Sequence, residues 1–488
     1  MAILILLFTL FWFAVFTKEL FFWLWLWQLK EYHMGRFRAH FEAQKFRKII
    51  SSFWRLKFPK FTKKIILISF SSILLEILML FYLSFFLVIV LTILFFPVFI
   101  LSFQTLTVIW RKIIIEKAKK KRNRFKDLLV IGITGSYGKT STKEFLATIL
   151  SEKFRVLKTK EHQNSEVGIS QCILNDLKPE HEIFICEMGA YNRGGIKLLC
   201  DITKPKIGIL TGINEQHMAT FGSQENIIKA KYELIESLPA QGLAVFNGNN
   251  KYCRRLYSRP ANPKKFIYST FSTAVENVLL DIWAKNIKTE KESVAFRIFS
   301  KDGESADFRI NILGKHSILN ILGAVAVAKE LGMRFGEITK ACEKIEPWQG
   351  GIQIKKGING LNVIDATYSA NLNGVISHLE YLKIWPGKKV IVMPCLIELG
   401  RASKEVHKRI GQKVAEVCDL AIITTKDRFK EIKEGAGDKA FFIENPKDIF
   451  EKIKNFLGGD LSSEALAKED VVLLESRVPN QLIKQLLQ

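Results

Sequence analysis

The stretch GSYGKTSTKEF, which runs from Gly135 to Phe145, combines closely spaced glycines with a lysine and several hydroxyl side chains. It follows the apolar run DLLVIGIT (127–134), which predicts a buried strand, and apolar residues at helical spacing predict a helix from about Lys139. A strand, a glycine-rich turn and a helix direct backbone N–H groups at an anion, so this context predicts a phosphate-binding loop for ATP. Lys139 would contact the outer phosphates, and Thr140 or Ser141 would place a hydroxyl on Mg²⁺. The expected nucleotide-binding residues of the loop are Gly135, Ser136, Gly138, Lys139, Thr140 and Ser141.

Two further polar residues follow apolar strands. Glu187 ends the run IFIC, where a carboxylate could bind Mg²⁺ near the phosphates, although it could equally cap the next turn. His217 comes after IGILTGI, at the strand end where parallel sheets place their ligands. Because Mg²⁺ prefers oxygen ligands, chemistry alone permits His217 to be a structural histidine or a ligand.

The loop departs from the strict pattern GxxxxGK[ST], since Ile133 stands where the first glycine belongs, and a tight structural turn is the alternative. Its shortened form, GxxGKT[ST], resembles the loop of the Mur ligases. Further segments resemble that family in order and rough spacing over residues 128–488, closest to the branch that adds D-alanyl-D-alanine to a muramoyl tripeptide. They are KEHQNSEVGIS (160–170), CEMGAYNRGGI (186–196), TGINEQHMATFGS (211–223), KAKYELI (229–235), AVFNGNN (244–250), GKHSILNILGA (314–324), IDATYSAN (364–371), LIELGRASKEVHKRIG (396–411) and VVLLESR (471–477).

The resemblance implies an ATP- and Mg²⁺-dependent ligase that phosphorylates a substrate carboxylate and then forms an amide with an incoming amine. It implies roles for residues that chemistry alone would not single out. Lys231 matches a lysine that becomes carbamylated and serves the metal site, and His217 would help to hold a second Mg²⁺. The implied catalytic residues are Lys139, Lys231 and His217, and the implied metal ligands are Thr140, Glu187 and His217. Nucleotide contacts are implied for His316, Asn320 and Asp365, and substrate contacts for Asn164, Tyr368 and Asn371.

Several positions depart from the family pattern. Ala219 stands where a glutamate is usual, and Gly351 stands where an arginine contacts phosphate. Ala366 replaces the second acid of a pair, and Cys395 replaces an aspartate. Removing a positive charge from a phosphoryl-transfer site weakens transition-state stabilisation, so these changes bear on rate and amino-acid specificity rather than on ATP binding.

The first part of the chain has a different character. Residues 1–28 and 65–110 are almost wholly apolar, long enough for about three membrane spans, with Lys18 and Glu19 separating a first span (1–17) from an aromatic run. Two spans would share a tight turn near Ser84, and Glu76, the only charge between 65 and 110, should face another helix. The basic segments 29–64 and 111–127 carry +9 and +7 of the chain's net +24. Positive charge beside apolar spans marks the cytoplasmic side and attracts anionic lipids, which favours a membrane over nucleic acid as the partner.

These patterns divide the 488 residues into three units. Residues 1–127 are expected to form a membrane anchor, 128–348 an ATP-binding central Mur ligase domain, and 349–488 a Rossmann-like ligase domain. The fold class is therefore α/β, preceded by transmembrane helices, with the catalytic domains in the cytoplasm. The seven scattered cysteines form no CxxC pair and suit a reducing compartment.

The anchor stands where soluble relatives carry a domain that grips the uridine nucleotide of their substrate. This substitution favours a membrane- or lipid-linked peptidoglycan precursor as acceptor, with an amino acid or a dipeptide as the second substrate. Two alternatives remain open at this point. One is a ligase of another peptide polymer, of polyglutamate or pseudomurein type, and the other is a membrane-bound nucleotide-binding scaffold with weakened catalysis. Three spans are too few to favour a transporter.

Overall fold

The structure is a computed structural model that describes residues 2–29, 56–82, 85–161, 163–271, 274–275, 278–367, 371–458 and 469–487. The chain divides into two compact units, residues 1–116 and 117–488, and each is described by itself. Three predicted features lie outside the described residues: the turn near Ser84, most of the basic segment 29–64, and Tyr368.

The first unit consists of long apolar helices, α1 (Ala2–Leu29), α4 (Lys63–Tyr82) and the first part of α5 (Phe85–Asn123). Lys18 and Glu19, which separate the apolar run 1–17 from the aromatic run, both lie inside α1, and both are good helix formers. Glu76 of α4 faces other helices, as expected. It accepts hydrogen bonds from Trp12 Nε1 at 2.8 Å and from Thr92 Oγ1 at 3.0 Å.

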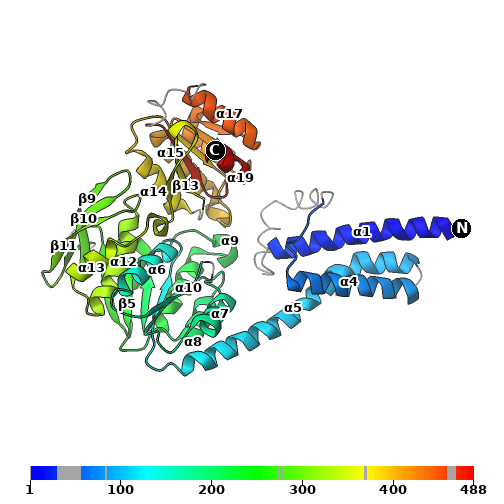
Figure 1. Ribbon diagram of the computed structural model, residues 1–488, viewed down its shortest axis with the longest axis horizontal. Helices are drawn as coiled ribbons and strands as arrows, with labels where there is room; N and C mark the ends of the chain where they lie inside the picture. Colours follow the sequence, from blue (N-terminus) through cyan, green and yellow to red (C-terminus); the bar gives the residue numbers. More distant parts are fainter. Residues whose placement is uncertain are drawn as a thin grey trace. The chain divides into compact units, whose positions relative to one another are not determined.

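The second unit begins with a mixed nine-stranded sheet in the order β11-β10-β9-β6-β5-β4-β1-β3-β2 (Figure 1). Neighbouring strands of the series β2, β3, β1, β4, β5, β6 and β9 pair in parallel. The pairs β9–β10 and β10–β11 are antiparallel. The strands are β1 (Leu129–Thr134), β2 (Val156–Lys158), β3 (Ile183–Glu187), β4 (Ile207–Leu210), β5 (Leu243–Asn247), β6 (Lys264–Ser269), β9 (Ile282–Thr289), β10 (Val294–Ser300) and β11 (Ser305–Ile310). A separate short pair is formed by β7 (Ala274–Val275) and β8 (Val278–Leu279).

Alternate residues of β1 face two different layers of helices. Ile131 and Ile133 join a core that includes α6, α12 and α13, while a Cβ on Gly132 would lie 2.8 Å from Leu234 of α10. Gly132 therefore lets α10 pack close to the sheet. The helices of this region are α6 (Lys139–Leu150), α7 (Glu166–Asp176), α8 (Gly195–Thr203), α9 (Met218–Phe221), α10 (Gln224–Glu236), α11 (Lys251–Tyr257), α12 (Ser317–Glu330) and α13 (Phe335–Cys342).

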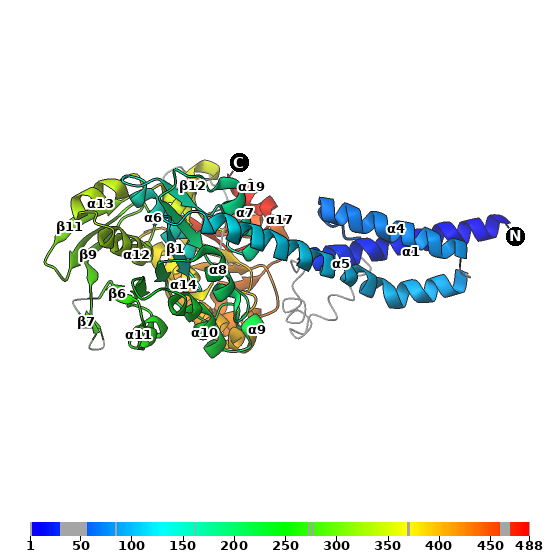
Figure 2. The same ribbon diagram turned by 90° about the horizontal axis from the view of Figure 1, so that it is seen from below.

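The C-terminal region is a six-stranded sheet in the order β12-β13-β17-β14-β15-β16, parallel except for β12 (Figure 2). Alternate strand residues again face opposite layers: Ile364 and Leu473 belong to the core with α14 and α15, and Val363 and Leu474 to the core with α17 and α19. This arrangement confirms the predicted α/β architecture. The elements are β12 (Gln353–Lys356), β13 (Asn362–Ala366), α14 (Leu372–Leu382), β14 (Lys389–Met393), α15 (Ser403–Val417), β15 (Leu420–Ile423), α16 (Phe429–Ala436), β16 (Ala440–Phe442), α17 (Pro446–Leu457), β17 (Val471–Glu475) and α19 (Asn480–Leu487), with short 3₁₀ turns at Pro347–Gly350, Ile358–Gly360, Gly400–Ala402 and Gly437–Lys439.

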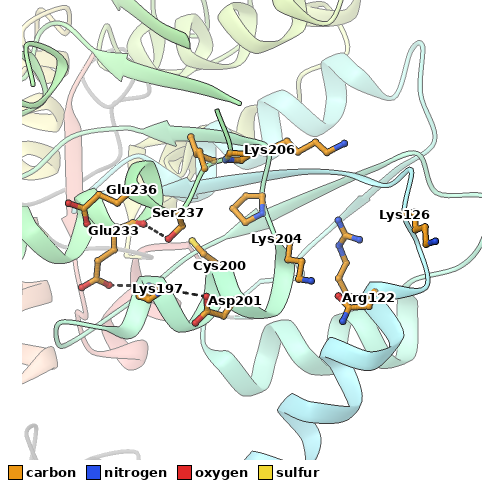
Figure 3. A pocket seen from close by; sticks show the side chains of 14 residues that line it. Arg122, Lys126, Lys197, Cys200, Asp201, Lys204, Lys206, Glu233, Glu236 and Ser237 are labelled. Atoms are coloured by element: carbon orange, nitrogen blue, oxygen red, sulfur yellow. Dashed lines mark hydrogen bonds and ion pairs between the residues drawn. The ribbon is translucent and has the colours of Figure 1, made fainter. Parts of the chain in front are cut away.

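The last turns of α5 are fixed to the central sheet through Arg122 (Figure 3). Its guanidinium donates to the backbone oxygens of Thr203, Phe125 and Leu128 at 2.9, 2.7 and 3.2 Å. A hollow of about 770 Å³ lies beside Arg122, and Lys126 and Lys206 are also among the residues that line it. It sits where β1 and β4 begin, the opposite sheet edge from the glycine-rich turn, so it is separate from the candidate active site.

Candidate active site

The glycine-rich turn connects β1 to α6 at the carboxyl edge of the sheet. Gly138 caps α6 with φ 75°, a left-handed conformation that favours glycine. A Cβ added there would lie 2.4 Å from Asn320 Oδ1, so α12 places Asn320 directly against the turn. No side chain among the described residues caps the first turn of α6. Its backbone N–H groups therefore suit an anion, as the sequence predicts.

Two lysines give this site its positive charge. Lys139 donates from Nζ to Gly135 O at 3.0 Å, and loss of hydration lowers its pKa, with Glu187 acting in the opposite direction. Lys231 lies almost fully buried in α10, and burial together with the charge of Lys139 lowers its pKa to about 7. Two cations in each other's field and shielded from water are stabilised by an anion, which is the electrostatic environment that a polyphosphate requires.

Glu187 connects two other predicted site residues, Thr140 and Asn164, and lies near Lys143. One carboxylate oxygen accepts from Thr140 Oγ1 at 2.9 Å and the other accepts from Asn164 Nδ2 at 3.1 Å, while Lys143 Nζ lies 3.8 Å away. No group of three or more His, Cys, Asp or Glu suited to a metal occurs in the described part of the chain. One carboxylate and one hydroxyl nevertheless fit Mg²⁺, which usually keeps several waters and completes its octahedron with substrate phosphates.

His217 precedes α9 and adopts a left-handed conformation with φ 65°. Its Nδ1 lies 2.5 Å from Glu398 Oε2, and its ring meets the ring of Tyr191 edge-on at 5.1 Å. Burial lowers the pKa of His217, against the opposing effect of Glu398, and the charges of Lys231 and Lys139 lower it further. His217 thus lies within the field of both lysines, although no hydrogen bond joins it to Glu187 in the described structure.

Of the other predicted residues, Asn371 lies where the two α/β regions meet, whereas Asp365 has its hydrogen bonds within the C-terminal region. Asn371 caps α14 by accepting from Gly374 N at 3.1 Å, and Asn214 donates to Asn373 Oδ1 at 2.8 Å. Asp365 accepts from Lys355 Nζ at 2.6 Å and from Thr367 Oγ1 at 2.7 Å. Burial acts to raise the pKa of Asp365, but these hydrogen bonds outweigh it and lower the pKa.

His316 and Asn320, both predicted to contact the nucleotide, have different surroundings. Asn320 lies against the glycine-rich turn, whereas the half-buried His316 meets the ring of His378 of α14 edge-on at 5.2 Å. Burial and His378 together lower the pKa of His316 to about 3, so its ring is neutral. His378 in turn contacts the fully buried Glu475 at 2.6 Å. His316 therefore belongs to the contact between the two regions.

Comparison with known proteins agrees with this geometry. Residues 133–328 match the Mur ligase middle domain, and residues 352–475 match the domain described as Mur ligase, glutamate ligase domain. The chain belongs to the Mur ligase family. It is 30% identical over 363 residues to the UDP-N-acetylmuramoyl-tripeptide–D-alanyl-D-alanine ligase of Bacillus subtilis, covering 71% of this chain and 76% of that relative. It is also 30% identical to the Escherichia coli enzyme of the same name, over 58% of this chain and 61% of that one.

Solved structures of Mur ligases resemble the same part of the chain. MurF from Acinetobacter baumannii superposes with a TM-score of 0.69 and 25% identity, covering 77% of this chain and 80% of that one. MurF from Thermotoga maritima in complex with ADP gives a TM-score of 0.65 and 25% identity, covering 77% and 83%. The nucleotide in the second structure supports ATP as the cofactor of this Mur ligase.

The structure also locates the departures from the Mur ligase pattern. Gly351 lies beside the glycine-rich turn, and a Cβ there would have only Ser141 Oγ, at 3.8 Å, for a neighbour. There is space for a side chain, but the φ of 85° is left-handed and favours glycine, and this chain lacks the charge of an arginine here. Ala219 donates its backbone N–H to Glu398 O at 3.1 Å. Cys395 is buried and donates its N–H to Thr425 Oγ1 at 2.8 Å, and Ala366 is buried at the end of β13.

Residue-level reasoning from sequence missed two side chains of this site. Lys143 is fully buried between Glu144 at 3.0 Å and Glu187 at 3.8 Å, and its spacing of four from Lys139 in a predicted helix was the available signal. Glu398 lies in the segment LIELG, which resembles the Mur ligases, but the resemblance implies no role for this carboxylate. Its contact with His217 joins residues 181 positions apart, which local patterns do not predict.

Proposed function

We propose that this Mur ligase forms an amide bond at the expense of ATP and adds D-alanyl-D-alanine, or a single amino acid, to a peptidoglycan precursor. The observation that carries the proposal is the cluster in which Thr140 and Asn164 both donate to Glu187, beneath the glycine-rich turn and beside two lysines of lowered pKa. The dipeptide is favoured because it appears in the names of the relatives that are 30% identical to this chain.

The chemistry proceeds in two transfers. The acceptor's carboxylate oxygen attacks the γ-phosphorus of ATP, ADP leaves, and an acyl phosphate forms. The amine nitrogen of the second substrate then attacks the acyl carbon, phosphate leaves with the bonding electrons, and the nitrogen loses a proton. Phosphoryl transfer needs alignment and charge neutralisation more than covalent help from the protein.

The residues of the site divide this work. The first-turn N–H groups of α6 and Lys139 would hold the phosphates, and Asn320 would lie against the nucleotide from α12. Thr140 and Glu187 would hold Mg²⁺, which neutralises charge on the phosphates when bound. Lys231, with its pKa of about 7, presents the neutral amine that carbamylation by CO₂ requires. Asn164, Asn371 and Tyr368 are proposed to contact substrate.

The test measures ADP release by the full chain in detergent with MgATP, UDP-linked muramoyl tripeptide and D-alanyl-D-alanine. ADP release should depend on both peptide substrates, and Lys139→Ala should abolish it. A binding scaffold would take up nucleotide without substrate-dependent ADP release, and that result would refute the ligase. Release with other acceptors or amino acids alone would instead favour a ligase of another peptide polymer.

We further propose that the first unit anchors the enzyme in the cell membrane, with the catalytic domains in the cytoplasm. Two helical segments in the described part, Leu7–Gln28 and Lys64–Tyr82, are long and apolar enough to span a bilayer. Many of their large apolar side chains are exposed, with Phe11 and Phe70 both at 66%. Contact with lipid hydrocarbon would stabilise such an apolar surface, whereas contact with water would be unfavourable. The sequence of the third expected span lies in α5.

This proposal is tested by extraction and by substrate choice. The chain should remain in the membrane pellet after alkaline carbonate treatment, and protease added to inside-out vesicles should digest the catalytic domains. Release into the supernatant would refute the anchor. Offering radiolabelled D-alanyl-D-alanine with either UDP-linked or lipid-linked muramoyl tripeptide then tests a membrane acceptor, because exclusive use of the UDP-linked compound would exclude it.

A further inference from the structure

His217 and Glu398 meet across the two catalytic domains in unusual backbone conformations. Both have φ 65°, in the left-handed region that non-glycine residues enter at a cost. Such conformations persist where the surrounding structure imposes them, and they cluster at functional sites. The two side chains lie 2.5 Å apart, with 23% and 27% of their surfaces exposed.

The seating of the Glu398 segment supports a specific contact rather than a chance surface pair. Besides its carboxylate, Glu398 uses its backbone oxygen, which accepts from Ala219 N at 3.1 Å. Gly400 packs on the same residue, and a Cβ on Gly400 would lie 3.2 Å from Ala219 N. Residues 398–400 of the C-terminal domain are therefore fitted onto residues 217–219 of the central domain.

The contact also determines what the imidazole can do. A carboxylate only accepts hydrogen bonds, so in a neutral ring the N–H must be on Nδ1, which faces Glu398. Nε2 then keeps its lone pair, the form that binds a cation. Histidines that bind metals usually donate their other N–H to a carboxylate or carbonyl, which fixes the tautomer and the ring orientation.

We propose that Glu398 is a positioning residue that reaches from the C-terminal domain to prepare His217 for a divalent cation. Since this carboxylate belongs to a different domain from His217, the imidazole is oriented for a cation only when residues 398–400 are seated on residues 217–219. Cation binding at His217 is thereby coupled to the contact between the two domains. The inference rests on the proposed function, together with the role in holding a second Mg²⁺ that the resemblance implies for His217.

The test measures Mn²⁺ binding to the full chain in detergent with saturating ADP, by the loss of the free Mn²⁺ electron paramagnetic resonance signal. Removing a carboxylate behind a metal-binding histidine typically weakens the metal about 10- to 100-fold, and we expect this for Glu398→Ala. Glu398→Gln, whose amide oxygen still accepts, should bind Mn²⁺ with an affinity between those of Glu398→Ala and the wild type. Glu405→Ala removes an exposed carboxylate from α15 and should leave the affinity unchanged.

Two further variants separate orientation from structure. In a His217→Ala background, Glu398→Ala should have no additional effect on Mn²⁺ affinity, because its proposed action passes through the imidazole. Gly400→Val should weaken Mn²⁺ as Glu398→Ala does, since its side chain would push residues 398–400 away from Ala219. Gly437→Val also introduces a side chain at positive φ, 62°, but with nothing within 4 Å, and it should retain the wild-type affinity.

Wild-type Mn²⁺ affinity in Glu398→Ala, or additive losses in the double variant, would overturn the inference. If Glu398→Ala does not fold, as judged by circular dichroism, then wild-type affinity in Glu398→Gln overturns it. Substrate-dependent ADP release that requires Lys139 would still stand in either case. Failure of the wild-type chain to release ADP would instead refute the proposed function.

Discussion

Lys231 allows a quantitative test of how much the burial of a lysine in this site destabilises the folded protein. Its side chain is 3% exposed, and burial and Lys139 lower its pKa from 10.5 to about 7. A depression of this size corresponds to about 5 kcal/mol of folding free energy at a pH below both values. We therefore expect Lys231→Met, which keeps an unbranched apolar chain without the charge, to raise the melting temperature of the nucleotide-free enzyme at pH 6.5.

The sign of the pH dependence follows from proton binding. Between pH 7 and 10.5 the unfolded chain holds a proton on Lys231 that the folded chain has lost, so wild-type stability rises with pH over this window. From pH 6.5 to 9 this gain amounts to roughly 2 to 3 kcal/mol, and the variant lacks it. The advantage of Lys231→Met should therefore shrink by about 3 °C over that interval.

The assay is thermal unfolding of the full chain in detergent, in CO₂-depleted buffers that keep Lys231 unmodified. Lys229→Met is the matched control, because Lys229 lies on the same helix, is 48% exposed and pairs with Glu225 at 3.9 Å. It should change the melting temperature little at either pH. A Lys231→Met variant that is no more stable than wild type at pH 6.5, or whose advantage is the same at pH 9, would refute this account of the buried lysine.

Three other substitutions test separate parts of the structure. Gly138→Ala should abolish ADP binding in calorimetry, because its Cβ would clash with Asn320; Gly303→Ala, at φ 88° with nothing within 4 Å, should bind normally. Arg122→Ala should lower the free energy of unfolding by about 3 kcal/mol in urea titrations, since two buried carbonyls and one partly buried carbonyl lose their donor; Lys126→Ala, beside it, should not. Glu76→Leu should lower the melting temperature in detergent because Trp12 and Thr92 lose their acceptor, and Glu76→Gln should restore most of the loss; equal stability of Glu76→Leu and wild type would contradict the role of that carboxylate.

Much of the fold could be predicted from sequence because its signals are local. The apolar run 127–134 and the glycines after it specify β1, the turn and the start of α6, and the structure places them within two residues of the expected bounds. The runs LNVID and VVLLE likewise become the adjacent strands β13 and β17. Each of these strands is buried on both faces and reads as a continuous apolar segment.

The same local reasoning was incomplete where contacts are distant. The charge of Lys18 and Glu19 marks the end of an apolar run, but it does not show whether the helix ends there, and α1 continues through both residues. Asn214 and Asn373 are 159 residues apart and meet only after two domains have folded. The periodicity of apolar residues does not predict this contact, because the contact depends on the path of each loop after its strand.

The distribution of charge in the candidate site explains why sequence resemblance and geometry lead to the same chemistry. Lys139 and Lys231 lie within the field of Glu187, and the fully buried Lys143 lies between Glu187 and Glu144. Such an excess of positive charge destabilises the folded protein by itself, and a structural role would favour apolar replacements. The positive charge becomes favourable when an anion binds. A nucleoside triphosphate supplies that negative charge, and its phosphate oxygens supply Mg²⁺ ligands in addition to Thr140 and Glu187. The folding cost of these buried lysines and the affinity of the site for MgATP thus have the same electrostatic origin.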